Sequence, residues 1–474
     1  MQTRLFIGGK WTGTATTLPV VNPFTGAEIA QVSLGDTQTL DSALDAARSA
    51  FPTTRAVPAH ERAALLRRIA DGIEARRGKF AATIVAEAGK PITQAEGEVT
   101  RAIGTFTVAA DEARRWNGGE VLALDATPAG AGHTGIARRF PIGVISAITP
   151  FNFPLNLVAH KVAPCIATGN TMVVKPAPKT PLTALMLAEV IAAAGAPPGQ
   201  MNFVTCANEH AARLVTDDRV AMVSFTGSPD VGWPLKSLAG KKRVCLELGG
   251  NAGVIVHEDA DLADAVPLIA VGAFGNAGQS CISVQRIFAH EKIHDELRAR
   301  LIAHIREKVK TGDPTDRGTT VGPMINRDAL QRAQARIASA IATGAHIVIG
   351  GEVRGPCLEA TLLEDVPLSH ESCREELFAP IATLHRYADF EEALRLVNDS
   401  RFGLQAGIFT RDLALAHRAF ETLDVGGVLI NQVPTWRVEN MPYGGIKDSG
   451  FGREGIRYAM EEMTEIKTLI FRQA

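Results

Sequence analysis

The feature that most constrains the fold is an alternation of short apolar runs with helical stretches between residues 144 and 248. Helix-compatible stretches such as residues 183–194 separate the apolar runs. Because strands buried on both faces are typical of parallel sheets covered by helices, this rhythm predicts an α/β protein built on a doubly wound parallel sheet. The runs that are predicted to be its first strands are residues 144–148, 171–175, 201–205 and 222–225.

Polar residues follow these strands at the points where the strands end. Asn152 lies between two phenylalanines after the first strand, Lys175 closes the second, and Glu247 lies in a further strand-like run, residues 243–248. In parallel α/β sheets, ligands bind beyond the carboxyl ends of the strands. We therefore expect these side chains to face one crevice.

The stretch Phe225-Thr226-Gly227-Ser228 stands where a phosphate-binding turn is expected, because the usual Gly-x-Gly-x-x-Gly motif is missing. Ser228 is placed to cap a helix that has Pro229 at its first position. The free N–H groups at such a helix N-terminus suit a pyrophosphate. A capped helix without a ligand is the alternative.

A cysteine at position 281 lies among small and polar residues, in Gly278-Gln279-Ser280-Cys281-Ile282-Ser283. It follows an apolar, helix-compatible run, residues 265–274. A cysteine in such an open setting can act as a nucleophile on a carbonyl carbon. The alternative is a small buried hydrophobe, which is the usual role of a free cysteine.

The composition is that of an ordinary globular chain, and 474 residues are too many for one core, so two or three domains are expected. With 49 basic and 51 acidic residues, the chain has no basic excess for nucleic acid or an anionic membrane. Its cysteines show no C-x-x-C spacing and no zinc-type pairing with histidine, so we expect reduced thiols and no metal. With no signal pattern or membrane-length apolar run, a cytoplasmic protein is predicted.

Seven motifs occur in a fixed order along the chain, and in this order they resemble the NAD(P)-dependent aldehyde dehydrogenase superfamily over essentially the whole sequence. They are Phe151-Asn152-Phe153-Pro154, Lys175-Pro176-Ala177, Phe225-Thr226-Gly227-Ser228, Glu247-Leu248-Gly249-Gly250, Gly278-Gln279-Ser280-Cys281, Glu375-Glu376-Leu377-Phe378-Ala379-Pro380 and Met441-Pro442-Tyr443-Gly444-Gly445-Ile446-Lys447-Asp448-Ser449-Gly450.

The resemblance implies catalytic roles for three residues. Cys281 would attack the aldehyde carbon as a thiolate and form a thiohemiacetal, which becomes a thioester after oxidation. The side-chain amide of Asn152 and the backbone N–H of Cys281 would hold the oxyanion. Glu247 would activate the water that hydrolyses the thioester, and it could also help to deprotonate the thiol.

The resemblance also implies a site for NAD or NADP. Lys175 would lie at the adenine ribose, Gly227 and Ser228 at the pyrophosphate, Glu376 at the nicotinamide ribose and Phe378 beside the nicotinamide ring. The other predicted cofactor-binding residues are Ile148, Thr149, Pro150, Phe151, Ala177, Pro178, Phe225, Thr226, Val231, Leu248 and Gly249.

The sequence departs from the family pattern at two positions. Many NAD-preferring members carry a glutamate where this chain has Pro178, and the loss of that carboxylate removes a repulsion against a 2′-phosphate and admits NADP. Members that oxidise anionic aldehydes often carry arginine where this chain has Ser280. Arg437 lies in the region that lines the family's substrate funnel, where it could contact an anionic substrate or pair with Glu439.

The residues around Cys281 and the segment 452–460 are similar to the lactaldehyde-dehydrogenase-like branch, whose members take small hydroxy- or phosphonate-bearing aldehydes. The expected organisation is an NAD(P)-binding domain (1–119 and 142–248), a catalytic domain (249–447) and a β oligomerisation arm (120–141 and 448–474). An exposed terminal strand in that arm favours a homodimer or homotetramer. A CoA-acylating enzyme and a catalytically idle relative are the alternatives; Glu247 argues against the first and the complete set of Asn152, Glu247 and Cys281 against the second.

Overall fold

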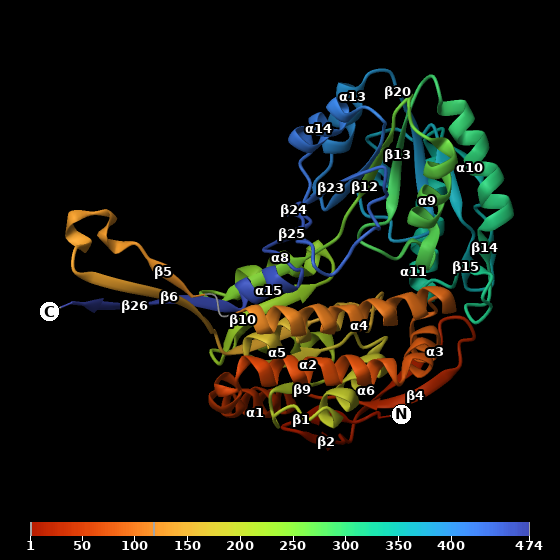
Figure 1. The fold of residues 1–474 in the computed structure, drawn as a ribbon. Helices are drawn as coiled ribbons and strands as arrows, with labels where there is room; N and C mark the ends of the chain where they lie inside the picture. Colours follow the sequence, from red (N-terminus) through yellow and green to blue (C-terminus); the bar gives the residue numbers. More distant parts are fainter. Residues whose placement is uncertain (1, 117–118, 474) are drawn as a thin grey trace.

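The chain folds into two α/β lobes and a projecting arm, as Figure 1 shows for the computed structural model, which describes residues 2–116 and 119–473. The first lobe is built on a sheet with the strand order β2-β1-β9-β8-β7-β10-β11-β25. The strands from β9 to β11 in this order run parallel, and β1 and β25 pair antiparallel with the two ends of that set. The bounds are β1 (Leu5–Ile7), β2 (Lys10–Thr12), β7 (Val144–Ile148), β8 (Thr171–Lys175), β9 (Met201–Phe203), β10 (Val220–Thr226), β11 (Arg243–Glu247) and β25 (Gly450–Phe451).

Alternating residues of the central strands enter two different cores. Val173 of β8 and Val223 of β10 pack with Leu40 of α1 (Thr37–Ala56) on one face. Met172 and Val174 pack on the opposite face. Helices therefore cover both faces of the sheet, which confirms the predicted doubly wound parallel sheet. The helices of the second face are α2 (Ala59–Glu74), α3 (Arg77–Ala88), α4 (Ile92–Arg115), α5 (Asn156–Thr168), α6 (Pro181–Ala193) and α15 (Ile456–Glu462).

The predicted strand bounds in this lobe are correct for two of the five strands, and in the other three they differ by one or two residues at one or both ends. Strands β7 and β8 have the predicted bounds, whereas β9 ends two residues early, at Phe203. Pro52, a residue type that ordinarily interrupts a helix, lies inside α1. The packing of the apolar face of α1 on the sheet outweighs the helix hydrogen bond that proline removes.

The second lobe contains a seven-stranded sheet in the order β16-β19-β20-β13-β12-β22-β23, parallel except for the edge strand β16. Helices again cover both faces: Val254 packs toward α9, α10 and α11, and Ile255 toward α13 and α14. The strands are β12 (Ala252–Val256), β13 (Val284–His290), β16 (His346–Ile349), β19 (Thr361–Glu364), β20 (Ile381–Tyr387), β22 (Gln405–Phe409) and β23 (Gly427–Ile430). The helices are α9 (Leu262–Phe274), α10 (His294–Lys308), α11 (Arg327–Ala342), α13 (Phe390–Asn398) and α14 (Leu413–Thr422).

The arm is a three-stranded antiparallel sheet that projects from the first lobe (Figure 1). The hairpin of β5 (Glu120–Leu122) and β6 (His133–Pro141) pairs with the C-terminal strand β26 (Thr464–Arg472). Strand β26 lies at the edge of this sheet and exposes a row of apolar side chains. The β arm and the exposed terminal strand that the sequence predicts are thus present, but β25 and α15, which lie within the predicted arm range 448–474, belong to the first lobe. The exposed side chains are Val121, Ile466, Leu469, Ile470 and Phe471.

Among the described residues, no helix is long and apolar enough to cross a membrane. Residues 2–116 and 119–473 also contain no group of three or more His, Cys, Asp or Glu side chains placed to hold a metal ion.

Candidate active site

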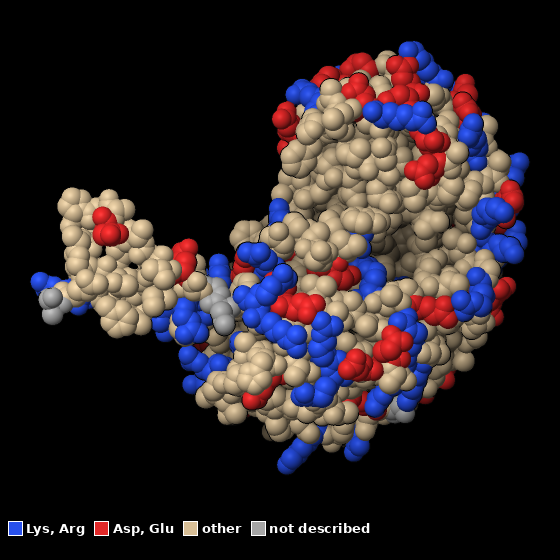
Figure 2. Space-filling model, viewed as in Figure 1, with Lys and Arg blue, Asp and Glu red and all other residues tan. Residues whose placement is uncertain are grey.

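The three predicted catalytic residues converge between the lobes, where the surface is hollowed in Figure 2. Cys281 precedes β13, Asn152 follows β7, and Glu247 ends β11. Cys281 and Asn152 line both of two adjoining cavities. One, of about 320 Å³, includes residues of α4, and we call it the α4 cavity. The other, of about 530 Å³, includes the start of α8 (Pro229–Leu238) and also Glu247, and we call it the α8 cavity.

The backbone before Cys281 adopts an unusual conformation that sets the direction of the nucleophile. Asn276, Ala277 and Gly278 all have positive φ angles, of 52°, 53° and 64°. A Cβ atom on Gly278 would lie 2.0 Å from the carbonyl oxygen of Ala379, so glycine is required there. This left-handed turn ends the helical segment and brings Cys281 to the junction of the two cavities.

Cys281 differs from the other cysteines in its accessibility. It is partly exposed, whereas Cys165, Cys206, Cys245, Cys357 and Cys373 are buried. Burial of the Cys281 sulfur raises its pKa to about 12, and a hydrogen bond with Tyr443 opposes that shift. The resting thiol therefore holds its proton at neutral pH, and the reaction needs a base or a donor that stabilises the thiolate.

Glu247 is almost completely buried, and neither of its carboxylate oxygens has a hydrogen-bond partner among the described residues. Burial raises its pKa well above the ordinary value, and the negative charge of Glu454 adds to this shift. Nearby Arg437 and Lys161 oppose it. A carboxyl group without partners, in the same cavity as Cys281, has the properties of a general base that works on a bound water.

The amide of Asn152 is held in place by one hydrogen bond, from Nδ2 to the carbonyl oxygen of Gln279 at 3.0 Å. The Nδ2 group has a second N–H, which remains available at the cavity junction. The Asn152 Oδ1 atom is buried and has no partner within the described part of the chain. This geometry allows Asn152 to donate to an oxyanion on a carbon bound to Cys281.

Many of the predicted cofactor residues line the α8 cavity. Ser228 is the N-cap of α8 with Pro229 next, as predicted, but its side chain makes no capping hydrogen bond and is left free. The buried hydroxyl of Thr226 also has no partner among the described residues. Free donors at a helix N-terminus fit a pyrophosphate. The predicted residues on this cavity are Pro150, Phe151, Thr226, Gly227, Ser228, Leu248, Gly249, Glu376 and Phe378.

Glu376 faces the same cavity and has close glycine neighbours. It accepts a hydrogen bond from the Gly250 N–H at 3.1 Å, and burial raises its pKa to about 7. A Cβ atom on Gly249 would lie 2.6 Å from a Glu376 carboxylate oxygen. The glycine is therefore needed for this carboxylate to reach the cavity.

The remaining predicted cofactor residues do not line the α8 cavity. Lys175 is buried at the end of β8 and donates from Nζ to Asn208 Oδ1 at 2.9 Å. Pro178 lines a separate cavity. The residues that fall outside the α8 cavity are Ile148, Thr149, Lys175, Ala177, Pro178, Phe225 and Val231.

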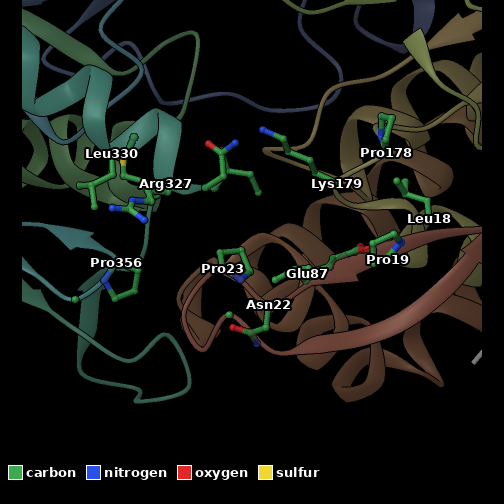
Figure 3. Close-up of a pocket in the computed structure, with 16 residues that line it drawn as sticks. Leu18, Pro19, Asn22, Pro23, Glu87, Pro178, Lys179, Arg327, Leu330 and Pro356 are labelled. Carbon is green, nitrogen blue, oxygen red and sulfur yellow. The ribbon is translucent and has the colours of Figure 1, made fainter. Parts of the chain in front are cut away.

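Figure 3 shows that separate cavity, which measures about 580 Å³ and lies beside the α8 cavity. Leu18 and Pro19 of β3 (Thr17–Val21) lie on one side and Arg327 of α11 on the other. Lys179 belongs to the lining of both cavities. None of the three predicted catalytic residues lines it, so its size does not make it the reaction site.

Several residues of the α4 cavity were not predicted from the sequence. Tyr443 and His160 line it, although neither had a predicted role. Arg437, which was expected near the substrate, lines the same cavity. The expected alternative pairing of Arg437 with Glu439 is wrong, because Glu439 instead accepts from Arg101 at 2.9 Å and contacts His160 at 2.6 Å. The pairing of His160 with Glu439 joins residues 279 positions apart, which no local sequence signal reports.

Arg437 packs against an aromatic ring and not against a close carboxylate. Its guanidinium carbon lies 3.6 Å from the centroid of the Tyr443 ring. The nearest carboxylate oxygen, on Glu454, is 3.9 Å from Nη2, and the Nε and Nη2 atoms have no hydrogen-bond partner among the described residues. The α4 cavity thus has a buried positive charge on its wall.

The chain is similar to known enzymes over its full length. It is 40% identical to 3-sulfolactaldehyde dehydrogenase of Priestia aryabhattai, over 99% of this chain and 98% of the relative. The crystal structure of aldehyde dehydrogenase 21 from Physcomitrella patens, in complex with the reaction product succinate, superposes with a TM-score of 0.97 at 42% identity, covering 99% of this chain and 98% of that one.

A third similar protein is glyceraldehyde-3-phosphate dehydrogenase GapN from Methanocaldococcus jannaschii, solved with NADP, with a TM-score of 0.93 at 37% identity, covering 97% of this chain and all of that one. The model of the aldehyde dehydrogenase family matches residues 11–469. That match spans both lobes and most of the arm, and it includes Cys281, Asn152 and Glu247. With its cysteine, carboxylate and amide assembled between two doubly wound lobes, the chain belongs to the aldehyde dehydrogenase family.

Proposed function

We propose that Cys281 is the nucleophile with which this enzyme oxidises a small aldehyde to its carboxylic acid. Its sulfur bonds to the aldehyde carbon, and the carbonyl oxygen takes the negative charge and accepts from Asn152. The residues of the α8 cavity would hold NAD(P), which would supply the hydride acceptor for this carbon, so that the carbon bound to Cys281 becomes a thioester. Support comes from the place of Cys281 and Asn152 on both cavities, which lets substrate and cofactor approach from opposite sides.

Glu247 would complete the reaction by removing a proton from the water that attacks the thioester. The C–S bond breaks, the carboxylic acid leaves, and the proton returns to the sulfur or to solvent. The cofactor would be held by the residues of the α8 cavity, with its pyrophosphate at Ser228 and its nicotinamide ribose at Glu376. The free N-terminus of α8 and the carboxylate of Glu376 support this arrangement.

We infer further that the aldehyde carries an anionic group, and one observation carries this inference. Arg437 is buried, with its side chain 4% exposed, and lacks a hydrogen-bonded partner among the described residues. A buried charge is costly unless it is paired. The other cationic side chains on the α4 cavity already have partners: Lys90 pairs with Glu98, and Arg101 with Glu439.

Arg437 is therefore the cation that a substrate carboxylate, sulfonate or phosphonate would meet. The names of the relatives agree with this chemistry, since 3-sulfolactaldehyde carries a sulfonate and succinate a second carboxylate. The α4 cavity, of about 320 Å³, suits a molecule of that size.

Replacing Arg437 with Met is expected to lower kcat/KM for succinic semialdehyde about 100-fold, because a hydrogen bond to a charged group contributes about 1.5–3 kcal/mol. The uncharged butanal should lose much less, since it makes no ion pair and only the effect of Arg437 on the Cys281 thiol remains. Initial rates of NAD(P)H formation with both aldehydes measure the difference. Arg457→Met, which removes an exposed arginine of α15, is the matched control. An equal loss for both aldehydes would contradict an anionic substrate.

The cofactor and domain assignments follow from the same reasoning. Either NAD or NADP would bind, because Pro178 places no carboxylate where a 2′-phosphate would lie. Residues 1–119 and 142–248 would form the cofactor domain and residues 249–447 the catalytic domain. The unpaired cysteines support a reducing compartment, which we take to be the cytoplasm.

The arm, formed by the β5–β6 hairpin and strand β26, would join subunits into a homodimer or homotetramer, because β26 offers an unpaired apolar edge. The double substitution of Leu469 and Phe471 by Glu should shift the mass in solution toward the monomer, as light scattering would measure. Lys467→Gln, on the same face of the same strand, should leave the mass unchanged. A monomeric wild-type protein would contradict this role of the arm.

A further inference from the structure

We propose that the Tyr443 hydroxyl donates a hydrogen bond to the Cys281 thiolate and is a further catalytic residue of this enzyme. The phenol oxygen lies 3.4 Å from the Cys281 sulfur, which is a suitable distance for an O–H···S contact. The proposal rests on the proposed role of Cys281 as nucleophile. It adds a donor on the sulfur itself, whereas Asn152 serves the carbonyl oxygen.

The position of Tyr443 is fixed on both its backbone and its side chain. Its N–H donates to the carbonyl oxygen of Glu454 at 2.9 Å, and the Glu454 N–H donates back at 2.7 Å. The side chain is 5% exposed and packs with Ile282 and Leu404 beside Cys281. A donor fixed in this way needs no reorganisation when charge develops on the sulfur.

Arg437 makes the phenol a better donor. Its guanidinium carbon lies 3.6 Å from the Tyr443 ring centroid, and a cation over the ring face withdraws electron density from it. Burial at the same time raises the pKa of Tyr443 well above its usual range, so the hydroxyl keeps its proton. The O–H group therefore remains available throughout the pH range in which the thiolate forms.

The charges that face the Cys281 sulfur show why such a donor is needed. Glu247 at the end of β11 and Glu376, before β20, both disfavour a negative sulfur, and Arg437 favours it. In the step itself the S–H bond breaks and the proton passes to a water molecule of the cavity and on to solvent, while the new thiolate accepts from Tyr443. When the sulfur bonds to the aldehyde carbon its charge is lost, and the hydrogen bond weakens. Tyr443 thus lowers the cost of the reactive ionised form.

The test is the pH dependence of Cys281 alkylation in Tyr443→Phe, which keeps the ring and removes only the hydroxyl. Iodoacetamide reacts with the thiolate, and mass spectrometry of the peptide that contains Cys281 follows its rate from pH 6 to 10. We expect a rate about tenfold lower at each pH, which corresponds to a thiol pKa about one unit higher. Tyr458→Phe, which removes a phenol outside both cavities, should match the wild type.

N-ethylmaleimide, a bulkier reagent, separates ionisation from access. A loss of the same size with both reagents supports the proposal, because the thiolate fraction affects them equally. An unchanged or faster rate in Tyr443→Phe, or a loss confined to the bulkier reagent, would overturn it. Alkylation does not require turnover, so these outcomes leave the nucleophilic role of Cys281 to be judged separately, from the activity of Cys281→Ala.

Discussion

Cys281→Ala is expected to lower aldehyde oxidation by on the order of 10⁴-fold or more, because loss of a nucleophile removes the covalent step completely. Binding of NAD(P) should stay near that of the wild type, since the N-terminus of α8 and Glu376 do not depend on the thiol. Initial rates of NAD(P)H formation measure the first effect. A fluorescence titration with NADPH measures the second.

Cys357→Ala is the matched control for this experiment. Cys357 is a buried cysteine of the second lobe that lines neither the α4 nor the α8 cavity. We expect it to retain turnover, with at most a moderate loss of stability from the missing side chain. Turnover by Cys281→Ala that approaches the wild-type rate would refute the covalent mechanism. If the wild-type protein bound the cofactor but oxidised no aldehyde, the result would instead favour a catalytically idle relative.

Local sequence signals predicted the scaffold well, and the structure places the three candidate catalytic residues around the same pair of cavities. Strands β7 and β8 are continuous apolar runs buried on both faces, so their bounds could be read directly. Asn152 follows β7 and Glu247 ends β11, and the carboxyl ends of these parallel strands must meet at one edge of the sheet. The meeting of Asn152 with Glu247 is therefore a consequence of topology, whereas Cys281 comes from the segment before β13 of the other lobe and reaches them through the packing of the two lobes.

The wall of the α4 cavity could not be predicted in the same way. His160 lies within the apolar helix α5, where a single histidine is indistinguishable from a core residue. Its partner Glu439 and the neighbouring Arg437 come from a loop in the other half of the sequence. Which carboxylate neutralises which cation depends on how the loop packs against α4 and α5, and this is a long-range property. The same packing brings Tyr443 to Cys281.

Glu247→Gln is expected to lower the steady-state rate by roughly 10²–10⁴-fold, because the hydrolytic water loses its general base. Formation of the thioester needs the carboxylate less, so rapid mixing should show a burst of NAD(P)H close to one equivalent per active site, followed by slow turnover. Cys281→Ser should show no such burst. If Gln at position 247 removed the burst together with turnover, Glu247 would act mainly before the thioester forms.

The pH dependence of the steady-state rate gives an independent test of Glu247 as the general base. A base works only when it is deprotonated, and burial raises the pKa of Glu247 well above the ordinary value. The steady-state rate of the wild type should therefore rise with pH to values above those at which an ordinary glutamate is fully ionised. In Glu247→Gln this rise should disappear from the slow phase. Acceleration of that phase by added CoA, and not by higher pH, would favour the acyl-transferring alternative, since CoA would then replace water as the acceptor.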